Sequence, residues 1–434
     1  MINNKTQKEK LPMDILGLSI VRFVVSAGSF VGPFLTMMLT LKLGYNEAKA
    51  GVFMSAVSVV SAVGLLLGGK LGDSFDRPVV LRTLQVLTAC LMLLGAALGF
   101  SATLPFIIAA AMACLQGSWP VMNAIVADVT PPSRRKEAFS LMYWANNIGF
   151  SAGPLIAGFL FNRAPRLLFV GNASALLLAA FVVSTMVKGK KYNINPNELL
   201  KNLSGLNASH DELAPQVDTG PQGPAIKKQT LYKTQANTLA IIFANPLLWM
   251  YGLVAIIISF IYSQQSFALP VFLKDILGSE NGPRVFGFVM SANGITVVAL
   301  TIPVMFLAKK MSSLSAMALS AAFYAIGFGS YFFASTLVMV IASTVVWTIG
   351  EILGATSGNA YIAEHAAPAH RSRINSVLSL TNTIGSSSAP LVSGPLARAY
   401  SSKSVWPLTG LLSVFSAMAF MFIRLVQKKG QREH

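Results

Sequence analysis

The feature that most constrains this chain is its series of long apolar segments. A helix needs about 20 apolar residues to cross the hydrocarbon core of a bilayer. The segments that meet this length are residues 13–41, 47–70, 79–100, 104–128, 137–162, 166–187, 246–274, 283–308, 313–335, 337–363, 372–399 and 404–425. They predict an all-α integral membrane protein with twelve transmembrane helices. The first segment is too long for the core of a cleavable signal, so we expect it to be retained as the first helix.

The composition agrees with this interpretation. Hydrophobic residues make up 54% of the 434 residues and charged residues 11%, whereas an ordinary soluble domain has about 25% charged residues. These values exclude a soluble globular enzyme and a mostly disordered chain. The net charge of +17 would indicate a nucleic-acid partner in a soluble protein. Here the charges lie between apolar segments, so we attribute them to membrane topology and expect no nucleic-acid partner.

The distribution of lysine and arginine predicts the orientation in the membrane. An even number of spans places both termini on one side. The N-terminus, the even-numbered loops, the central polar stretch and the C-terminus hold 24 of the 33 basic residues, whereas the odd-numbered loops and adjoining helix ends hold eight. The positive-inside rule therefore places both termini in the cytoplasm. We expect the chain to reside in the inner (plasma) membrane of a bacterium, in contact with membrane lipids.

The chain divides into two similar halves. Residues 188–244 are the one long polar break, which predicts a cytoplasmic linker between six-helix bundles at residues 1–187 and 245–434. Segments that start at Asn123 and Asn359 align without a gap through Gly158, at an offset of 236 residues. Identical pairs at this offset include Asn146/Asn382, Gly149/Gly385, Pro154/Pro390, Gly158/Gly394, Gly51/Gly287, Met54/Met290 and Ser55/Ser291. Parallel repeats of this kind predict two pseudo-symmetric bundles that alternate access to a site near the membrane midplane.

A loop motif follows the second segment, GGKLGDSFDRPVVLR. It matches the pattern G-x-L-a-D-r-x-G-r-k-x-x-l at Gly69, Leu71, Asp73, Arg77 and Leu81. The sequence therefore resembles the major facilitator superfamily, although Asp76 replaces a glycine of the motif and Pro78 a basic residue. The resemblance implies that Asp73 caps helix eleven, that Arg77 pairs with Asp128, and that these contacts form a gate on the cytoplasmic side. The alternative is a solvated ion pair in an ordinary positive-inside loop.

A second motif lies in the fifth segment, at Gly149, Gly153, Pro154 and Gly158. It resembles the antiporter motif g-x-x-x-G-P-x-x-G-G of the twelve-helix drug:proton antiporter branch, and so implies export. Ala113 stands where helix four of that branch has arginine. Glycines also allow close helix packing and Pro154 bends a helix, so generic packing explains the same residues.

Two charged residues lie inside apolar segments. Glu351 is about 13 residues from either end of the tenth segment, which places it roughly 20 Å deep. A carboxylate there is costly unless it is protonated, paired or hydrated, which suits a proton carrier. Arg22 lies in the first segment and must face a cavity or a partner. The resemblance places both residues on cavity-lining helices, so we predict that they form the coupling element, directly or through water or substrate. A static structural pair is the alternative.

Aromatic and amide side chains on other segments are candidates for a substrate cavity. They are Gln116, Trp119, Asn123, Tyr143, Asn146, Tyr262, Gln265 and Trp347. This mixture suits an amphipathic small molecule through dispersion contacts, and a cationic one through cation–π contacts as well. Interhelical hydrogen bonding and aromatic packing explain the same residues equally well.

The sequence has no Walker loop, no metal-ligand spacing and no readable nucleophile–base pair. We therefore expect a monomeric secondary transporter that is not an enzyme and needs no cofactor, with a proton gradient as its driving force. The leading hypothesis is proton-coupled efflux, by antiport, of amphipathic small molecules or drugs. Alternatives are a proton-coupled symporter of sugars, peptides or organic acids, a lipid flippase of the same fold, and, more remotely, a non-transporting membrane receptor.

Overall fold

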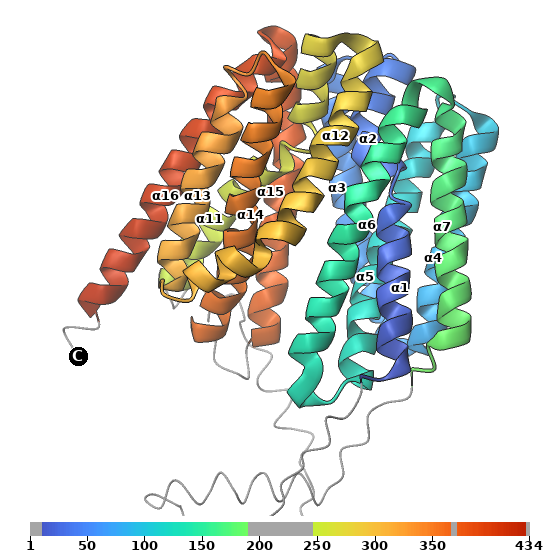
Figure 1. Cartoon of the computed structure of the whole chain (residues 1–434), viewed down its shortest axis with the longest axis horizontal. Helices are drawn as coiled ribbons and strands as arrows, with labels where there is room; N and C mark the ends of the chain where they lie inside the picture. Colours follow the sequence, from blue (N-terminus) through green and yellow to red (C-terminus); the bar gives the residue numbers. More distant parts are fainter. Residues whose placement is uncertain (1–10, 190–245, 366–370, 431–434) are drawn as a thin grey trace, which may run out of the picture.

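The computed structural model describes residues 11–189, 246–365 and 371–430. The predicted linker lies almost entirely outside the described residues, as does the loop after the tenth segment. The described chain is helical and forms two bundles that lie side by side (Figure 1). The first, in blue to green, comes from the N-terminal half, and the second, in yellow to red, from the C-terminal half.

The N-terminal half contains the six predicted spans. They are α1 (Met13–Ala27) with α2 (Val31–Met37) and the π-helix η1 (Met38–Lys42), then α3 (Glu47–Ser74), α4 (Arg77–Leu98), α5 (Leu104–Val129), α6 (Arg135–Arg163) and α7 (Pro165–Met186). The start of α4 accounts for the two departures from the loop motif. The Asp76 side chain caps the helix by accepting a hydrogen bond from the Val79 amide at 3.1 Å, and Pro78 occupies the first turn.

The C-terminal half contains the other six. They are α11 (Pro246–Ser263), α12 (Ala268–Ala308), α13 (Ser313–Ser330), α14 (Leu337–His365), α15 (Arg371–Ala399) and α16 (Val405–Gly430). The predicted seventh span is broken after Ser263, and its second part continues into the eighth as α12. These two spans bend apart at Gly278, whose φ of 77° favours glycine.

Hydropathy by itself detects fewer spans than the fold contains. Nine stretches of the described helices are long and apolar enough to cross a bilayer, and one of them, Pro246–Ala308, contains two predicted spans. The two helices left out, α6 and α15, carry charged first turns or runs of serine, threonine and asparagine. Both pack against the other half, where polar side chains have partners. The prediction of twelve membrane helices in two six-helix bundles is confirmed.

The two ends of the helices define two faces of the molecule. We name the face where α1 begins and where α7 and α16 end the linker face, and the other the opposite face. In Figure 1 the linker face is at the bottom. An even number of spans returns the chain to the face on which it started, so the N- and C-terminal ends of the described helices lie together there.

The two halves contact each other through two seams near the opposite face. In one seam α3 packs on α15, where a Cβ added to Gly394 would lie 2.5 Å from the Glu47 carbonyl oxygen. In the other α12 packs on α6, where a Cβ added to Gly287 would lie 2.5 Å from the Pro154 carbonyl oxygen. Small residues allow this close approach of helix backbones.

Hydrogen bonds between the halves lie on the same side of the molecule. They join Thr36 to Ser266, Ser55 to Ser387, Ser291 to Ser151, Lys274 to Glu47, and Asn162 to Ser279 and Glu280. Nearer the linker face, the side chains of Tyr143 in α6 and Thr301 in α12 also form a hydrogen bond between the halves. Most direct contacts between the halves therefore lie near the opposite face, and the two bundles diverge toward the linker face (Figure 1).

Candidate functional site

A cavity of about 720 Å³ lies between the two halves, and we name it the central cavity. Its N-terminal wall includes Ser58, Gln116 and Trp119, and its C-terminal wall includes Tyr262 and Glu351. Its volume is in the range of small-molecule sites. Among the described residues of this wall, Glu351 is the one with a formal charge, so it dominates the local electrostatics.

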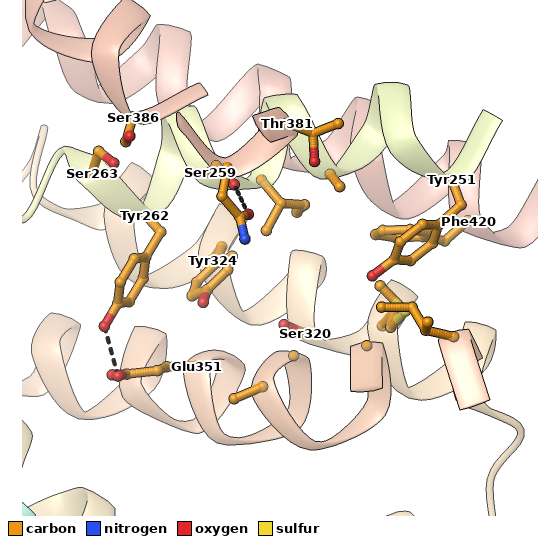
Figure 2. Close-up of a pocket in the computed structure, with 18 of the residues that line it drawn as sticks. Tyr251, Ser259, Tyr262, Ser263, Ser320, Tyr324, Glu351, Thr381, Ser386 and Phe420 are labelled. Atoms are coloured by element: carbon orange, nitrogen blue, oxygen red, sulfur yellow. Dashed lines mark hydrogen bonds between the residues drawn. The ribbon is translucent and has the colours of Figure 1, made fainter. Parts of the chain in front are cut away.

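Two donors from two other helices hold the Glu351 carboxylate. The Tyr262 hydroxyl, at the end of α11, donates to Oε1 at 2.7 Å, as Figure 2 shows. The Asn293 amide, on α12, donates to Oε2 at 2.8 Å and to the Thr348 hydroxyl at 2.9 Å. Hydrogen bonds to a charged acceptor are short and strong, so this arrangement offsets part of the cost of a carboxylate inside the membrane.

An aromatic cluster fills the C-terminal half between Glu351 and the opposite face. Trp347, one turn before Glu351, is fully buried and stacks on Phe328 with ring centroids 5.2 Å apart. Its indole nitrogen donates to the Tyr331 hydroxyl at 3.0 Å, and Trp406 packs on the same rings. The cluster fixes this stretch of α14. Trp347 therefore does not line the central cavity, and in this conformation it packs against other aromatic residues.

The structure does not bring Arg22 into contact with Glu351. The Arg22 guanidinium lies over the Trp119 ring, 3.4 Å from its centroid, and Nη1 faces the Met122 sulfur at 3.9 Å. Its buried Nε has no hydrogen-bond partner. The ion pairs among the described residues include neither Arg22 nor Glu351. A direct pair is thus absent from this conformation, in which Arg22 supports the cavity wall through Trp119.

The other predicted cavity residues separate into two groups. Gln116, Trp119, Asn146, Tyr262 and Gln265 line the central cavity. The remaining two, Asn123 and Tyr143, do not line it and have exposed side chains. Both lie nearer to the linker face, and the Tyr143 side chain reaches Thr301 of the other half.

The loop motif forms a charged cluster on the linker face. Arg77 pairs with Asp128 and also donates to the Gly72 carbonyl at 3.0 Å. Asp73 is 79% exposed and lies 3.4 Å from Arg77. Gly69 of α3 lies beside Pro120 of α5. The Arg77–Asp128 contact is as predicted, whereas Asp73 contacts its own half in this conformation.

The glycines of the fifth segment lie on two different faces of α6. A Cβ added to Gly149 would lie 2.5 Å from the Phe23 carbonyl oxygen, and Gly153 is similarly close to Ala27. These two permit tight packing on α1 within the N-terminal half. A Cβ added to Gly158 would instead lie 2.8 Å from the Pro283 carbonyl oxygen in the other half, and Pro154 belongs to the same seam.

The sequence analysis missed some residues of the site. Asn293 is the one asparagine in its apolar segment. A single amide among apolar residues was the feature by which the sequence could have identified it. Lys274 and Glu47 form an ion pair between the halves, with Nζ 2.7 Å from the carboxylate. They are 227 positions apart, and no sequence pattern connects them. Groups of histidine, cysteine and acidic residues that could hold a metal are absent from the described residues.

Comparison with known protein families and sequences identifies relatives of this chain. The model of the Major Facilitator Superfamily matches residues 18–390 and, in a second match, residues 277–434. A Na⁺, Li⁺, K⁺/H⁺ antiporter from Planococcus maritimus is 24% identical over 411 residues, which cover 91% of each chain. The uncharacterized transporter YqjV of Bacillus subtilis is 24% identical over 342 residues, 77% of this chain and 74% of that one.

Solved structures share the fold. A mutant of the peptide transporter POT in complex with alafosfalin has a TM-score of 0.73 at 16% identity, over 96% of this chain and 95% of that one. A mutant of the nucleoside transporter NupG has a TM-score of 0.70 at 15% identity, over 94% and 99%. The chain is a multi-pass membrane transporter rather than an enzyme, and it belongs to the Major Facilitator Superfamily.

Proposed function

We propose that this transporter is a proton-coupled antiporter in which Glu351 carries the proton and the central cavity carries an amphipathic small molecule. The linker face would lie in the cytoplasm of a bacterium, as the distribution of basic residues indicates. The conformation described here would then be open to the cytoplasm. Rocking of the two halves about the seams would expose the same cavity to the outside.

The observation that carries this proposal is the position of Glu351. It is a carboxylate inside the membrane region, on the wall of a cavity between the halves, held by donors from α11 and α12. A group in that position reaches water on alternate sides when the halves rock. Protonation removes its charge, so its interaction with a cationic substrate weakens when a proton binds. Competition of this kind couples proton movement in one direction to substrate movement in the other.

The charges of the two halves support exchange of a proton for a cation. Arg22 in the N-terminal half and Glu351 in the C-terminal half balance when the carboxylate is ionised. Either a proton or a monovalent organic cation at Glu351 raises the net charge of the site by one. The site can then change from facing one side of the membrane to facing the other with either a proton or the organic cation bound, at similar electrostatic cost. It cannot bind both at once.

A second candidate function is exchange of alkali cations for protons. The antiporter from Planococcus maritimus, 24% identical over 91% of this chain, favours it. The Tyr262 hydroxyl oxygen lies 2.7 Å from the carboxylate, and the Thr348 hydroxyl oxygen lies next to it, bound to the same Asn293 NH2 group as Glu351 Oε2. Oxygen atoms are the ligands that hard cations prefer, so a small cation could compete with a proton at the same place.

The test is proton movement in proteoliposomes that contain the full chain and a trapped pH indicator. Ethidium and tetraphenylphosphonium represent amphipathic cations, and Na⁺, K⁺ and Li⁺ salts represent alkali cations. A dipeptide, a sugar and a fluorescent phospholipid test the symporter and flippase alternatives. We expect proton release with the amphipathic cations. Release with the alkali salts alone would establish the second function in its place.

The variant Glu351→Gln keeps the hydrogen-bonding shape of the side chain and removes its titration. We expect it to abolish pH-driven transport while substrate counterflow continues. The matched control is Glu280→Gln, an exposed acid near the opposite face, which should transport normally. Unchanged proton coupling in Glu351→Gln would reject the role of this carboxyl group.

The linker-face cluster would act as the gate when the halves close there. Arg77 and Asp128 are already paired, and the exposed Asp73 is available to the other half. Asp73→Asn should therefore slow transport without lowering the thermal stability of this conformation. An unchanged transport rate would leave the cluster as a solvated ion pair.

A further inference from the structure

A second cavity, of about 600 Å³, lies entirely within the C-terminal half. Helices α11, α13, α14, α15 and α16 surround it. It shares part of its wall with the central cavity, including Tyr262, Glu351 and Asn382. Glu351 therefore lies at the boundary between two cavities, and we name the second one the C-terminal passage.

The passage runs from Glu351 toward the linker face. Figure 2 shows Glu351 and Tyr262 at one end and Tyr251 and Phe420 at the other, with Ser320 between them. Tyr251 is five residues from the start of α11, roughly 8 Å along the axis from the linker-face end of that helix. Beyond Glu351, toward the opposite face, the buried cluster around Trp347 fills the half.

Polar groups line the passage at intervals. The Ser320 hydroxyl donates to the Gly350 carbonyl at 2.6 Å, and the Ser259 hydroxyl donates to Asn382 Oδ1 at 2.6 Å. Each of these oxygens can still accept a hydrogen bond from water. The titratable groups on the wall are Tyr251 and Tyr262 from α11, Tyr324 from α13 and Glu351 from α14. A polar cavity of this size has room and partners for a chain of water molecules.

The N-terminal half is filled at the corresponding positions. Subtracting the repeat offset, 351 − 236 = 115 and 358 − 236 = 122, pairs Glu351 with Leu115 and Gly358 with Met122. Likewise 320 − 236 = 84 pairs Ser320 with Leu84. Met122 and Leu84 belong to a compact apolar core near the linker face. The passage therefore exists because the C-terminal half has small and polar residues at these positions. The fold that the two halves share does not require it.

One oxygen of the carboxylate is covered on the side of the central cavity. Asn293, which lines the central cavity and not the passage, covers Oε2. A bound substrate would also occupy the central cavity and exclude water from it. A proton that is displaced as a substrate enters the central cavity therefore needs a route out that the substrate does not block.

We propose that the C-terminal passage conducts protons between the linker face and Glu351, separately from the central cavity that takes the substrate. A hydronium ion in the passage gives its proton to the Glu351 carboxylate, which leaves water and a neutral carboxylic acid, and the reverse step releases the proton. This inference rests on the proposed role of Glu351 as the proton carrier. In this conformation the passage leads to the linker face, so the proton leaves toward the side from which the substrate enters.

The first test measures water access with thiol labelling. Cys90 and Cys114 are replaced by serine, and Ser320→Cys is compared with Leu84→Cys, its repeat counterpart. The probe is a small hydrophilic methanethiosulfonate reagent added at the linker face, with mass spectrometry of the full chain as readout. We expect Ser320→Cys to react on the order of 100-fold faster, because thiol reactivity follows solvent access. Equally slow labelling of both would overturn the proposal.

A plug in the passage tests the route itself. Gly358→Met introduces the residue found at the repeat counterpart Met122, and its Cβ would lie 3.1 Å from the Tyr251 hydroxyl. We expect it to slow labelling of Ser320→Cys but not of Ser58→Cys on the central cavity wall. Ala255→Leu plugs the passage from α11 and serves as a second variant, in case Gly358→Met does not fold. Equal slowing at both thiols would mean that the two cavities share one entrance, against the proposal.

The second test follows the proton. Infrared spectroscopy of the reconstituted full chain monitors hydrogen–deuterium exchange of the Glu351 carboxylic acid, whose C=O band is assigned by its loss in Glu351→Gln. We expect Gly358→Met to slow this exchange, because it interrupts the chain of water molecules that would carry the proton. Unchanged exchange would show that protons use the central cavity, and would overturn the inference. If transport by Glu351→Gln instead retained proton coupling, the proposed function would fail while the labelling result stood.

Discussion

The two seams between the halves can be compared contact by contact, because they are repeats of each other. In the first, the Ser55 hydroxyl of α3 donates to the Ser387 carbonyl of α15 at 2.6 Å. In the second, the Ser291 hydroxyl of α12 donates to the Ser151 carbonyl of α6 at 2.5 Å. The offset of 236 residues relates both partners, since 55 + 236 = 291 and 151 + 236 = 387. The close backbone contacts of Gly51 with Pro390 and of Gly287 with Pro154 follow the same rule.

The seams differ in charge. Glu47, at the start of α3, forms an ion pair with Lys274 of the other half. The repeat counterpart of Glu47 is Pro283 (47 + 236 = 283), which has no charge and contacts Gly158 through its carbonyl group. Shared backbone contacts thus set the geometry of the closed face, and an ion pair in one seam adds to its strength. Changes to the shared contacts should affect both seams equally, whereas changes to the ion pair should affect one.

The largest effect is expected from a side chain added at the glycine contacts. In Gly287→Val the new side chain meets the Pro154 carbonyl, and in Gly51→Val it meets the Pro390 carbonyl. Neither backbone can yield without separating the halves, at a cost of about 3 kcal/mol. Spin labels at Ala102→Cys and Ser335→Cys, exposed on the opposite face, should report a roughly 100-fold shift toward a wider distance in both variants.

Gly329→Val is the control for these glycine variants. A Cβ there would have no neighbour nearer than 3.8 Å, so the label distance should not change. Gly287→Ala and Gly51→Ala give smaller versions of the change if the valine variants do not fold. A wide distance in one seam variant and a normal distance in its counterpart would show that the seams are not energetically equivalent.

The ion pair should give an intermediate effect confined to one seam. The Lys274 and Glu47 side chains are 17% and 22% exposed, so solvent screens their attraction only in part. Lys274→Met should weaken closure of the opposite face by about 1 kcal/mol, roughly fivefold in population. The same spin labels measure this shift. In a double-mutant cycle, Glu47→Gln should then add little in the Lys274→Met background. Additive losses would mean that the two residues act independently.

The sequence could predict the seams in part. The twelve spans, the two halves and the pairs Gly51/Gly287 and Ser55/Ser291 follow from apolar length and from one repeat offset. The repeat tells which residues are equivalent but not which residues they touch. The contact of Gly51 with Pro390 depends on how the two halves dock, and so does the pairing of Lys274 with Glu47, 227 positions apart. Local sequence carries little information on either.

The site was predictable to a similar extent. A charged residue within an apolar span is costly, so Glu351 and Arg22 could be identified without a structure. The partners of these two residues could not be identified from the sequence. The direction in which a side chain points depends on small rotations of its helix about the helix axis. Arg22 lies on Trp119, and Glu351 meets Tyr262 and Asn293. Trp347 illustrates the same limit. It lies one turn from Glu351, yet it points into the aromatic cluster.

The smallest effect should come from the seam serines, and it tests the equivalence of the seams most finely. Ser55→Ala and Ser291→Ala each remove one hydroxyl that donates to a carbonyl across the seam. Interhelical hydrogen bonds in membranes average about 0.6 kcal/mol, which corresponds to a shift of about threefold in the spin-label populations. The Ser55 hydroxyl also reaches the Gly51 carbonyl of its own helix at 2.9 Å, so it is already shared between two acceptors. We therefore expect Ser55→Ala to have slightly less effect than Ser291→Ala, and the reverse order would show that packing at the α3 seam, and not its hydrogen bond, depends on that side chain.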